Sequence, residues 1–132
     1  MRILLDTNIF LEVLLGQERA ETVKRLLSTD RGHEFFITDF SLHSIGILLF
    51  RARHSDVFNR FVIDMMDGAG IEMLTLPVGE IKHVSENAER FGLDFDDAYQ
   101  YSVAEKNELT MVSFDSDFDR TARKRKEPLE LI

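Results

Sequence analysis

The chain has 132 residues, a formal charge of −8 and no cysteine. This length supports a single domain, residues 1–132, with a hydrophobic core of its own. The absence of cysteine excludes both a disulfide framework and a cysteine zinc site, and it is compatible with the cytoplasmic location that we expect. The longest strongly apolar run, residues 45–50, is far shorter than the roughly 20 residues that span a bilayer, so we expect no membrane association.

The negative charge comes from the second part of the chain. Residues 1–60 hold eight basic and eight acidic side chains, whereas residues 61–132 hold eight basic and sixteen acidic ones. Such an excess usually favours solubility, but it is also typical of a carboxylate cluster that binds a cation. The charge distribution therefore leaves both explanations open.

The apolar pattern predicts strands that alternate with helices. In chain order we expect a strand at 2–5, helices at 9–14 and 19–28, a strand at 34–38, helices at 40–53 and 55–67, a strand at 71–76, helices at 79–91 and 95–107, and strands at 109–113 and 129–132. The helix at 40–53 is predicted to begin at Asp39 or Ser41 as its cap. This order predicts an α/β fold, a three-layer α/β/α sandwich with a mostly parallel central sheet.

Acidic residues stand where the predicted strands end. Asp6 directly follows the first strand, and Asp115 follows the strand at 109–113. Asp94 and Asp97 open the helix at 95–107. Parallel sheets bind ligands beyond the carboxyl ends of their strands, so these acids are candidates for a binding site.

Each of these acids also has a simpler explanation. Asp6 precedes a helix and is a favoured N-cap, as are Thr7 and Asn8 after it. Asp94 as N-cap, with Asp97 three residues later, resembles a capping box. Three acids within residues 94–97 nevertheless exceed what a cap requires, so one of them is a candidate for the site.

The spacing of Asp115, Asp117 and Asp119 resembles a calcium-binding loop, but the rest of the loop is missing. Such a loop needs glycine at its sixth position and glutamate at its twelfth, where this chain has Arg120 and Lys126. The calcium interpretation is therefore excluded. Carboxylates that converge repel each other by up to about 4 kcal/mol per pair at 4 Å, and a hard divalent cation removes that cost. Mg²⁺ or Mn²⁺ prefers oxygen ligands, so the acids suggest a metal-dependent phosphodiesterase.

The two ends of the chain resemble PIN-domain ribonucleases, including the VapC-type toxins of toxin–antitoxin pairs. LLDTNIFL at residues 4–11 resembles the first motif of the family, and DAYQYSVAEKNELTMVSFDSDF at residues 97–118 resembles its C-terminal signature. The resemblance implies a PIN-like fold, an Mg²⁺ or Mn²⁺ site formed by Asp6, Asp97 and Asp115, and hydrolysis of RNA. It also implies a homodimer and a small antitoxin partner.

Further residues are expected to assist this site. The supporting positions are Thr7, Asn8, Asp39, Ser44, Asp94, Ser113 and Asp117. The basic residues that we expect to steer RNA are Arg51, Arg53, Lys124 and Arg125. For each basic residue singly, a solvated surface position is the simpler interpretation.

One position departs from the family pattern. The family carries a glutamate on the helix after the second strand, and the alignment places Ser44 there. Asp39, about one turn earlier, either substitutes for it or only caps the helix. The alternative function is therefore a catalytically impaired PIN-like module that acts by binding RNA or protein.

A phospho-accepting receiver domain has a similar length and a similar alternation of elements. A receiver needs an acidic pair beside its first strand and a lysine after a late strand. Here Thr7 and Asn8 follow Asp6, and no lysine directly follows the strand at 109–113. This pattern disfavours a receiver.

Overall fold

The computed structural model describes the backbone of residues 1–132 and every side chain except that of Met66. Its centre is a sheet of four parallel strands in the order β3-β2-β1-β4. The strands are β1 (Arg2–Leu5), β2 (Glu34–Thr38), β3 (Glu72–Leu74) and β4 (Thr110–Val112). All four carboxyl ends therefore meet at one edge of the sheet, as the sequence predicts.

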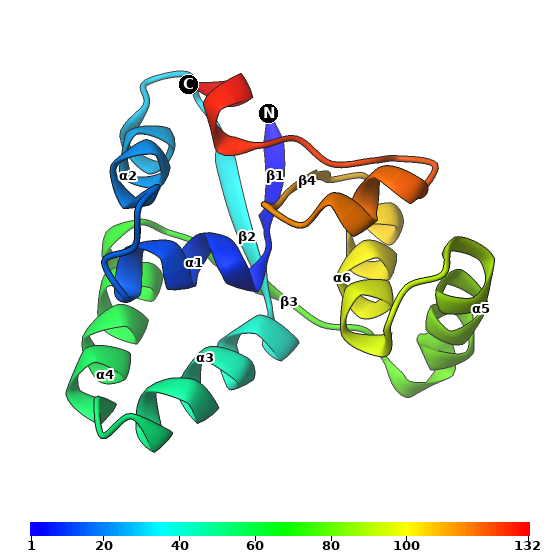
Figure 1. The fold of residues 1–132 in the computed structure, drawn as a ribbon, viewed down its shortest axis with the longest axis horizontal. Helices are drawn as coiled ribbons and strands as arrows, with labels where there is room; N and C mark the ends of the chain where they lie inside the picture. Colours follow the sequence, from blue (N-terminus) through cyan, green and yellow to red (C-terminus); the bar gives the residue numbers. More distant parts are fainter.

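Helices cover both faces of this sheet. In Figure 1, α1 (Thr7–Leu14), α2 (Ala20–Ser28), α3 (Asp39–Arg51) and α4 (Ser55–Ile63) lie to one side of the strands. The helices α5 (Ile81–Phe91) and α6 (Phe95–Lys106) lie to the other side. The predicted α/β fold with a central parallel sheet is confirmed.

Alternation along β1 divides the core into two clusters. Ile3 and Leu5 pack into the cluster that contains the buried residues of α1 to α3, whereas Leu4 packs into the cluster of α5 and α6. In β2, Ile37 and Phe36 divide in the same way. Successive side chains of a strand point to opposite faces, so these apolar runs are buried on both sides.

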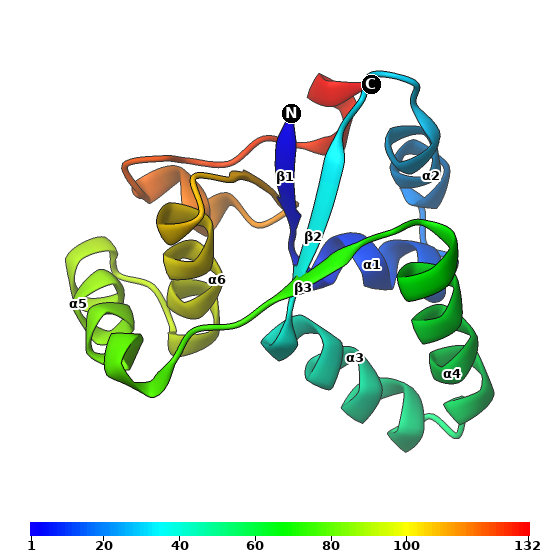
Figure 2. The ribbon, with the colours of Figure 1, turned by 180° about the vertical axis from the view of Figure 1, so that it is seen from behind.

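The predicted helix at 55–67 is interrupted. The helix α4 ends at Ile63, and a π-helical turn, Asp64–Gly68, follows it. The N–H of Ala69 donates to the carbonyl of Asp64 at 2.8 Å, which closes the wider turn. Met65 is thereby buried against the core before the chain enters β3, which crosses the front of the view in Figure 2.

The prediction of a last strand at 129–132 was wrong. Pro128–Leu131 forms a 3₁₀ helix instead. Glu127 and Glu130 form a capping box around its first turn, and proline favours the first position of a helix because its missing N–H is not needed there. The edge of the sheet beyond β4 has only a single bridge, between Val112 and Lys126.

In the described part of the chain, no helix has both the length and the apolar character needed to cross a membrane.

Candidate carboxylate site

Asp6 lies at the carboxyl end of β1 and is almost fully buried, with 5% of its surface exposed. Its Oδ1 accepts hydrogen bonds from the N–H of Thr7 at 2.8 Å and from Nε2 of Gln100 at 3.0 Å. Its Oδ2 accepts one from Oγ of Ser113 at 2.7 Å. Asp6 also occupies the N-cap of α1, which confirms the capping interpretation of this residue.

Asn8 and Ser113 tie the loop after β4 to α1. Nδ2 of Asn8 donates to Oγ of Ser113 at 3.1 Å, and the N–H of Phe114 donates to Oδ1 of Asn8 at 3.3 Å. The N–H of Asp115 donates to the same Ser113 Oγ at 2.9 Å. These contacts fix the backbone that presents Asp115 relative to Asp6.

Three carboxylates come together beside this network. Asp97, Asp115 and Asp117 each offer an oxygen, and these oxygens lie within 4.8 Å of one another. Asp97 projects from the first turn of α6, while Asp115 caps the 3₁₀ helix Ser116–Arg120 by accepting from the N–H of Asp117 at 2.9 Å. We call Asp97, Asp115 and Asp117 the carboxylate cluster.

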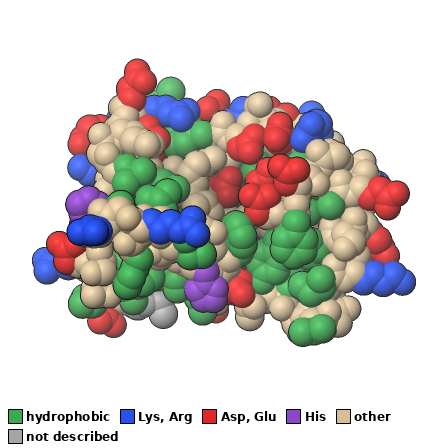
Figure 3. All heavy atoms as spheres, turned by 60° about the horizontal axis from the view of Figure 1, so that its bottom comes forward, with side chains coloured by type: hydrophobic (Ala, Val, Ile, Leu, Met, Phe, Trp, Pro, Cys, Tyr) green, Lys and Arg blue, Asp and Glu red, His purple; other side chains and the backbone are tan. Residues whose placement is uncertain are grey.

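Acidic side chains gather on the face of the molecule on which β1 and β2 end, as Figure 3 shows. Hydrophobic side chains border this patch on its lower side in that view. In the carboxylate cluster, Asp117 has a basic partner, Arg120, at 3.5 Å, and both side chains are about half exposed. An exposed pair of this kind contributes little to stability, so Arg120 offsets only a small part of the repulsion within the carboxylate cluster.

The environment disfavours negative charge at two of the acids. Burial raises the pKa of Asp97 to about 7, and the charges of Asp96, Asp6 and Asp115 add to that rise. Burial also raises the pKa of Asp6, although hydrogen bonds from Gln100 and Ser113 oppose the shift. Groups with raised pKa values that face one another are typical of functional sites.

The donor set fits a hard divalent cation. Mg²⁺ binds oxygen at about 2.0–2.1 Å, so two ligands on opposite sides of the ion lie about 4.2 Å apart. Neighbouring ligands of an octahedral ion lie about 2.9 Å apart. The three oxygens of the carboxylate cluster lie within 4.8 Å of one another, so side-chain rotations that bring them closer together would place them on one ion.

The structure brings together Asp97 and Asp115 as predicted, but the third member of the cluster is Asp117, which the sequence analysis gave only a supporting position. Asp6 lies beside the cluster and is close enough for its charge to raise the pKa of Asp97. Thr7, Asn8 and Ser113 lie in the hydrogen-bond network around Asp6, where supporting residues were expected.

Asp39 does not cap α3. Its carboxylate accepts from the hydroxyl of Tyr99 at 2.7 Å and from the hydroxyl of Thr75 at 3.1 Å. The cap is Thr38, whose Oγ1 accepts from the N–H of Ser41 at 3.0 Å, so the expectation that Asp39 or Ser41 is the cap was wrong. Asp39 is thus engaged by Tyr99 and Thr75 and is not a member of the carboxylate cluster.

Asp94 stands at the N-cap of α6, but its side chain makes no capping hydrogen bond, so the predicted capping box is not formed there. Ser44 is half-buried on α3, where it lines a shallow hollow together with Ile47, Leu48 and Arg51. The α3 serine that reaches the site is Ser41, which is fully buried.

Gln100 was not among the residues predicted from the sequence. This side chain is buried on α6 and contacts Asp6, Ser41 and Thr38. Its only signal in the sequence is a polar residue within the run Ala98–Ala104, all of which is buried. Its partners are 94, 59 and 62 positions away in the sequence, so spacing alone does not reveal them.

Arg19 is a second residue that the sequence analysis missed. Its guanidinium carbon lies 3.5 Å from the centre of the Phe114 ring, beside the loop that carries Asp115. Oε1 of Glu12, which is buried, accepts from the N–H of Arg19 at 2.7 Å and lies 3.5 Å from its Nε. The side chain of Arg19 remains about half exposed, so a cation is held at the margin of the site.

The basic residues expected to steer RNA differ in their surroundings. Arg125 is engaged within the chain, because it pairs with Asp119 at 3.3 Å and with Glu127 at 3.4 Å and donates to the carbonyl of Ser113. Its side chain is only 13% exposed. The other three, Arg51, Arg53 and Lys124, are exposed.

Residues 3–124 match the family model described as PIN domain. No curated protein matches the chain. Among solved structures, the chain is similar to VapC20 of Mycobacterium tuberculosis, a toxin that cleaves the sarcin–ricin loop, with a TM-score of 0.78, 19% identity, and coverage of 96% of this chain and 99% of that one.

Two further structures have the same fold. VapBC2 of Rickettsia felis, bound to a DNA fragment from its promoter, matches with a TM-score of 0.71, 15% identity, and coverage of 95% of this chain and 96% of that one. FitAcB of Neisseria gonorrhoeae matches with a TM-score of 0.70, 22% identity, and coverage of 98% of this chain and 99% of that one. At these sequence identities, the structural similarity shows that the chain shares the fold of these proteins.

Proposed function

The chain belongs to the PIN-domain family, and we propose that it is a metal-dependent endoribonuclease, the toxin component of a toxin–antitoxin pair. The observation that carries this proposal is the carboxylate cluster at the carboxyl ends of the strands. A relative in fold, VapC20 of Mycobacterium tuberculosis, cleaves the sarcin–ricin loop, which supports RNA as the substrate.

Each acid has its own part in the proposed site. Asp97 on α6 would hold the ion together with Asp115 and Asp117 from the segment after β4. Asp6 would add negative charge beside them. Ser113 donates to Asp6 and accepts from Asn8, which keeps Asp6 and the loop after β4 in fixed positions. When bound, Mg²⁺ or Mn²⁺ would neutralise phosphoryl oxygens and lower the pKa of a coordinated water.

The proposal predicts that the wild-type protein cuts a mixed-sequence RNA in Mn²⁺ or Mg²⁺ and does not cut it in EDTA. Asp115→Asn keeps the Oδ1 that accepts from the N–H of Asp117, so the 3₁₀ helix is preserved. The same change removes a charge from the cluster. Loss of several kcal/mol of charge stabilisation corresponds to a fall in rate of about 100-fold or more. Gel analysis of the RNA products measures this rate.

A matched control is Asp30→Asn, which removes an exposed carboxylate between α2 and β2. This variant should cut RNA like the wild type. Cutting that persists in Asp115→Asn or in EDTA would contradict the proposal. Absence of cutting by a wild-type protein that binds Mn²⁺ would instead favour the alternative, a PIN-like module that acts by binding.

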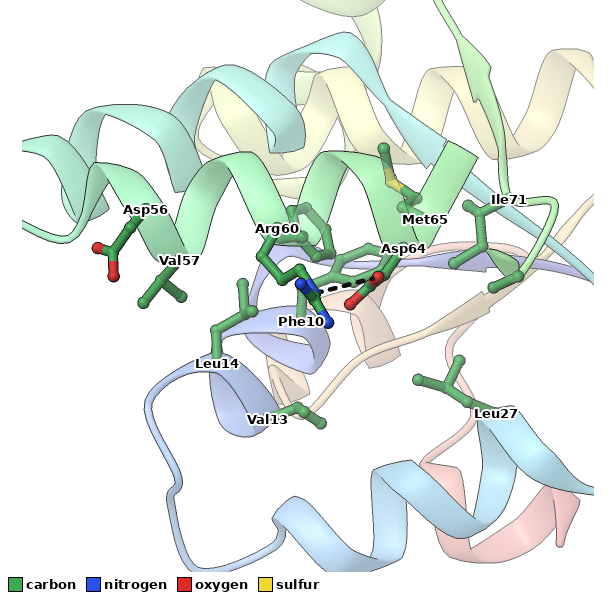
Figure 4. Close-up of a pocket in the computed structure, with 12 residues that line it drawn as sticks. Phe10, Val13, Leu14, Leu27, Asp56, Val57, Arg60, Asp64, Met65 and Ile71 are labelled. Carbon is green, nitrogen blue, oxygen red and sulfur yellow. Dashed lines mark ion pairs between the residues drawn. The ribbon is translucent and has the colours of Figure 1, made fainter. Parts of the chain in front are cut away.

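We propose that the antitoxin docks in an apolar pocket between α1, α2 and α4. The pocket has a volume of about 630 Å³ and contains one ion pair, Arg60 with Asp64 at 3.6 Å, marked in Figure 4. Its apolar lining includes Phe10, Val13, Leu14, Leu27, Val57, Phe61, Met65 and Ile71. An apolar pocket beside three helices suits the apolar face of a partner helix, and several structures with this fold are toxin–antitoxin complexes.

The pocket predicts binding of the uncharged apolar dye Nile red to the folded protein. Val57→Lys places a charge in the lining and should remove most of the dye fluorescence. Val78→Lys changes a valine that is 89% exposed and should leave the fluorescence unchanged. Weak fluorescence of the wild type, or an equal loss in both variants, would contradict an open pocket.

The homodimer remains a prediction. The outer side of α3 exposes three large apolar side chains, Ile47, Leu48 and Phe50, with exposed fractions of 54%, 37% and 56%. We propose this surface as the contact between the two copies.

A further inference from the structure

We infer that Gln100 is a positioning residue of the metal site: its amide holds the Asp6 carboxylate so that a single acceptor position, on Oδ2, remains open for an ion. The inference rests on the proposed metal-dependent function. It goes beyond that function because it names a neutral side chain that determines how one acid is presented.

The orientation of the Gln100 amide is determined by its partners. Nε2 carries two hydrogens, and it donates to Asp6 Oδ1 at 3.0 Å and to Ser41 Oγ at 2.7 Å. Oε1 accepts from the hydroxyl of Thr38. If the amide were reversed, its oxygen would face a carboxylate oxygen, so the arrangement has only one satisfied orientation.

Most of the lone-pair positions of the Asp6 carboxylate already accept hydrogen bonds. An ionised carboxylate has about four lone-pair positions. Three donors occupy three of them: the N–H of Thr7 and Nε2 of Gln100 on Oδ1, and the hydroxyl of Ser113 on Oδ2. One position on Oδ2 remains, so Asp6 contributes at most one bond to an ion.

Gln100 also joins α6 to α3 on the side of the site where the family pattern expects an acid. Thr38 and Ser41, at the start of α3, hold the amide from that side, and Ser41 Oγ lies 2.8 Å from Thr7 Oγ1. The side chains that Gln100 and Ser41 contact here are neutral apart from Asp6. A further carboxylate at this place would add a like charge beside Asp6 and the carboxylate cluster, and like charges repel. The side chain that contacts Asp6 from this side, Gln100, is therefore a neutral hydrogen-bond donor.

The test is the affinity for Mn²⁺, measured without RNA by titration of the electron paramagnetic resonance signal of free Mn²⁺. Gln100→Met keeps the length of the side chain and removes its amide. Residues that orient a metal ligand typically change metal affinity by about 10–100-fold when they are replaced, so we expect a loss of this size. Gln100→Asn, a milder change whose amide is one methylene too short to reach Asp6, should also weaken binding.

The matched control is Asn87→Leu. Asn87 is another buried amide, 3% exposed, which donates to Ser102 Oγ at 2.9 Å between α5 and α6. Asn87→Leu should lower the melting temperature, as we also expect for the Gln100 variants, but it should leave the Mn²⁺ affinity unchanged. This difference separates a positioning role from a general contribution to folding.

The outcomes separate the two proposals. If the wild type binds Mn²⁺ and both Gln100 variants bind it equally well, the positioning role is overturned and the nuclease proposal stands. An equal loss of affinity in Asn87→Leu would likewise overturn the positioning role. If the wild type binds no Mn²⁺, both the metal-dependent function and the role of Gln100 are overturned.

Discussion

Asp97→Asn should raise the melting temperature of the protein in EDTA by about 3–6 °C at pH 8 while abolishing RNA cleavage. Burial and the neighbouring carboxylates raise the pKa of Asp97 to about 7, so its charge destabilises the folded state. After allowance for solvent screening of a half-buried group, this cost is about 1–2 kcal/mol. The favourable interaction of a first-turn acid with the helix dipole is about 0.3–1 kcal/mol, so removal of the repulsion dominates.

The pH dependence follows from the sign of the shift. The pKa of Asp97 is about 7 in the folded state, against 3.8 for the unshifted group, so the folded state binds more protons between these values. Stability conferred by this residue therefore falls as the pH rises from about 4 to about 7. The gain from Asp97→Asn should be greatest above pH 7 and should shrink toward pH 5.

Thermal unfolding of three proteins in EDTA measures this effect. Glu89→Gln on α5 is the control, because it changes the net charge equally on an exposed side chain away from the cluster. It should leave the melting temperature nearly unchanged. Addition of Mn²⁺ should stabilise the wild type more than Asp97→Asn, because a ligand stabilises the state that binds it. A lower melting temperature of Asp97→Asn in EDTA would show that Asp97 serves chiefly to begin α6.

Phe118→Ala should cost about 3–5 kcal/mol of unfolding free energy, as large buried aromatic truncations do. Phe118 is fully buried in the core cluster of α5 and α6. It belongs to the 3₁₀ helix Ser116–Arg120, which also carries Asp117 and is capped by Asp115. Because one aromatic side chain anchors this segment, its loss should also weaken Mn²⁺ binding under conditions in which the variant remains folded.

Urea unfolding measures the stability of Phe118→Ala, and a Mn²⁺ titration below its unfolding transition measures the site. Leu129→Ala is the control, since Leu129 is 68% exposed in the last 3₁₀ helix and its truncation should cost little. A loss of stability in Phe118→Ala below about 1 kcal/mol would contradict close packing around the ring. Unchanged Mn²⁺ affinity in the folded variant would show that the loop holds its carboxylates without this anchor.

Local patterns predicted most of the fold. The strands at 2–5 and 34–38 begin and end where the sequence placed them, because short apolar runs bounded by polar residues or helix caps are set by neighbouring residues. The final segment at 129–132 was mispredicted as a strand, since Pro128 and the capping pair of Glu127 and Glu130 favour a 3₁₀ helix over pairing with the sheet. The rule that the carboxyl ends of parallel strands share one edge predicted that Asp6 and Asp115 would lie near each other. The family resemblance added Asp97 from the start of a helix, and the structure places Asp97 and Asp115 in one cluster.

The local sequence pattern was therefore sufficient to predict the strand and helix order, the parallel sheet and the edge at which the acids gather. Which side chains share the site depends on how the helices and strands pack together. In the structure, Asp117 is part of the carboxylate cluster, Asp39 accepts a hydrogen bond from the hydroxyl of Tyr99, and Gln100 donates one to Asp6. Secondary structure depends largely on residues that are neighbours in the sequence. The hydrogen bond between Gln100 and Asp6 instead joins residues 94 positions apart, so it depends on how α6 packs beside β1.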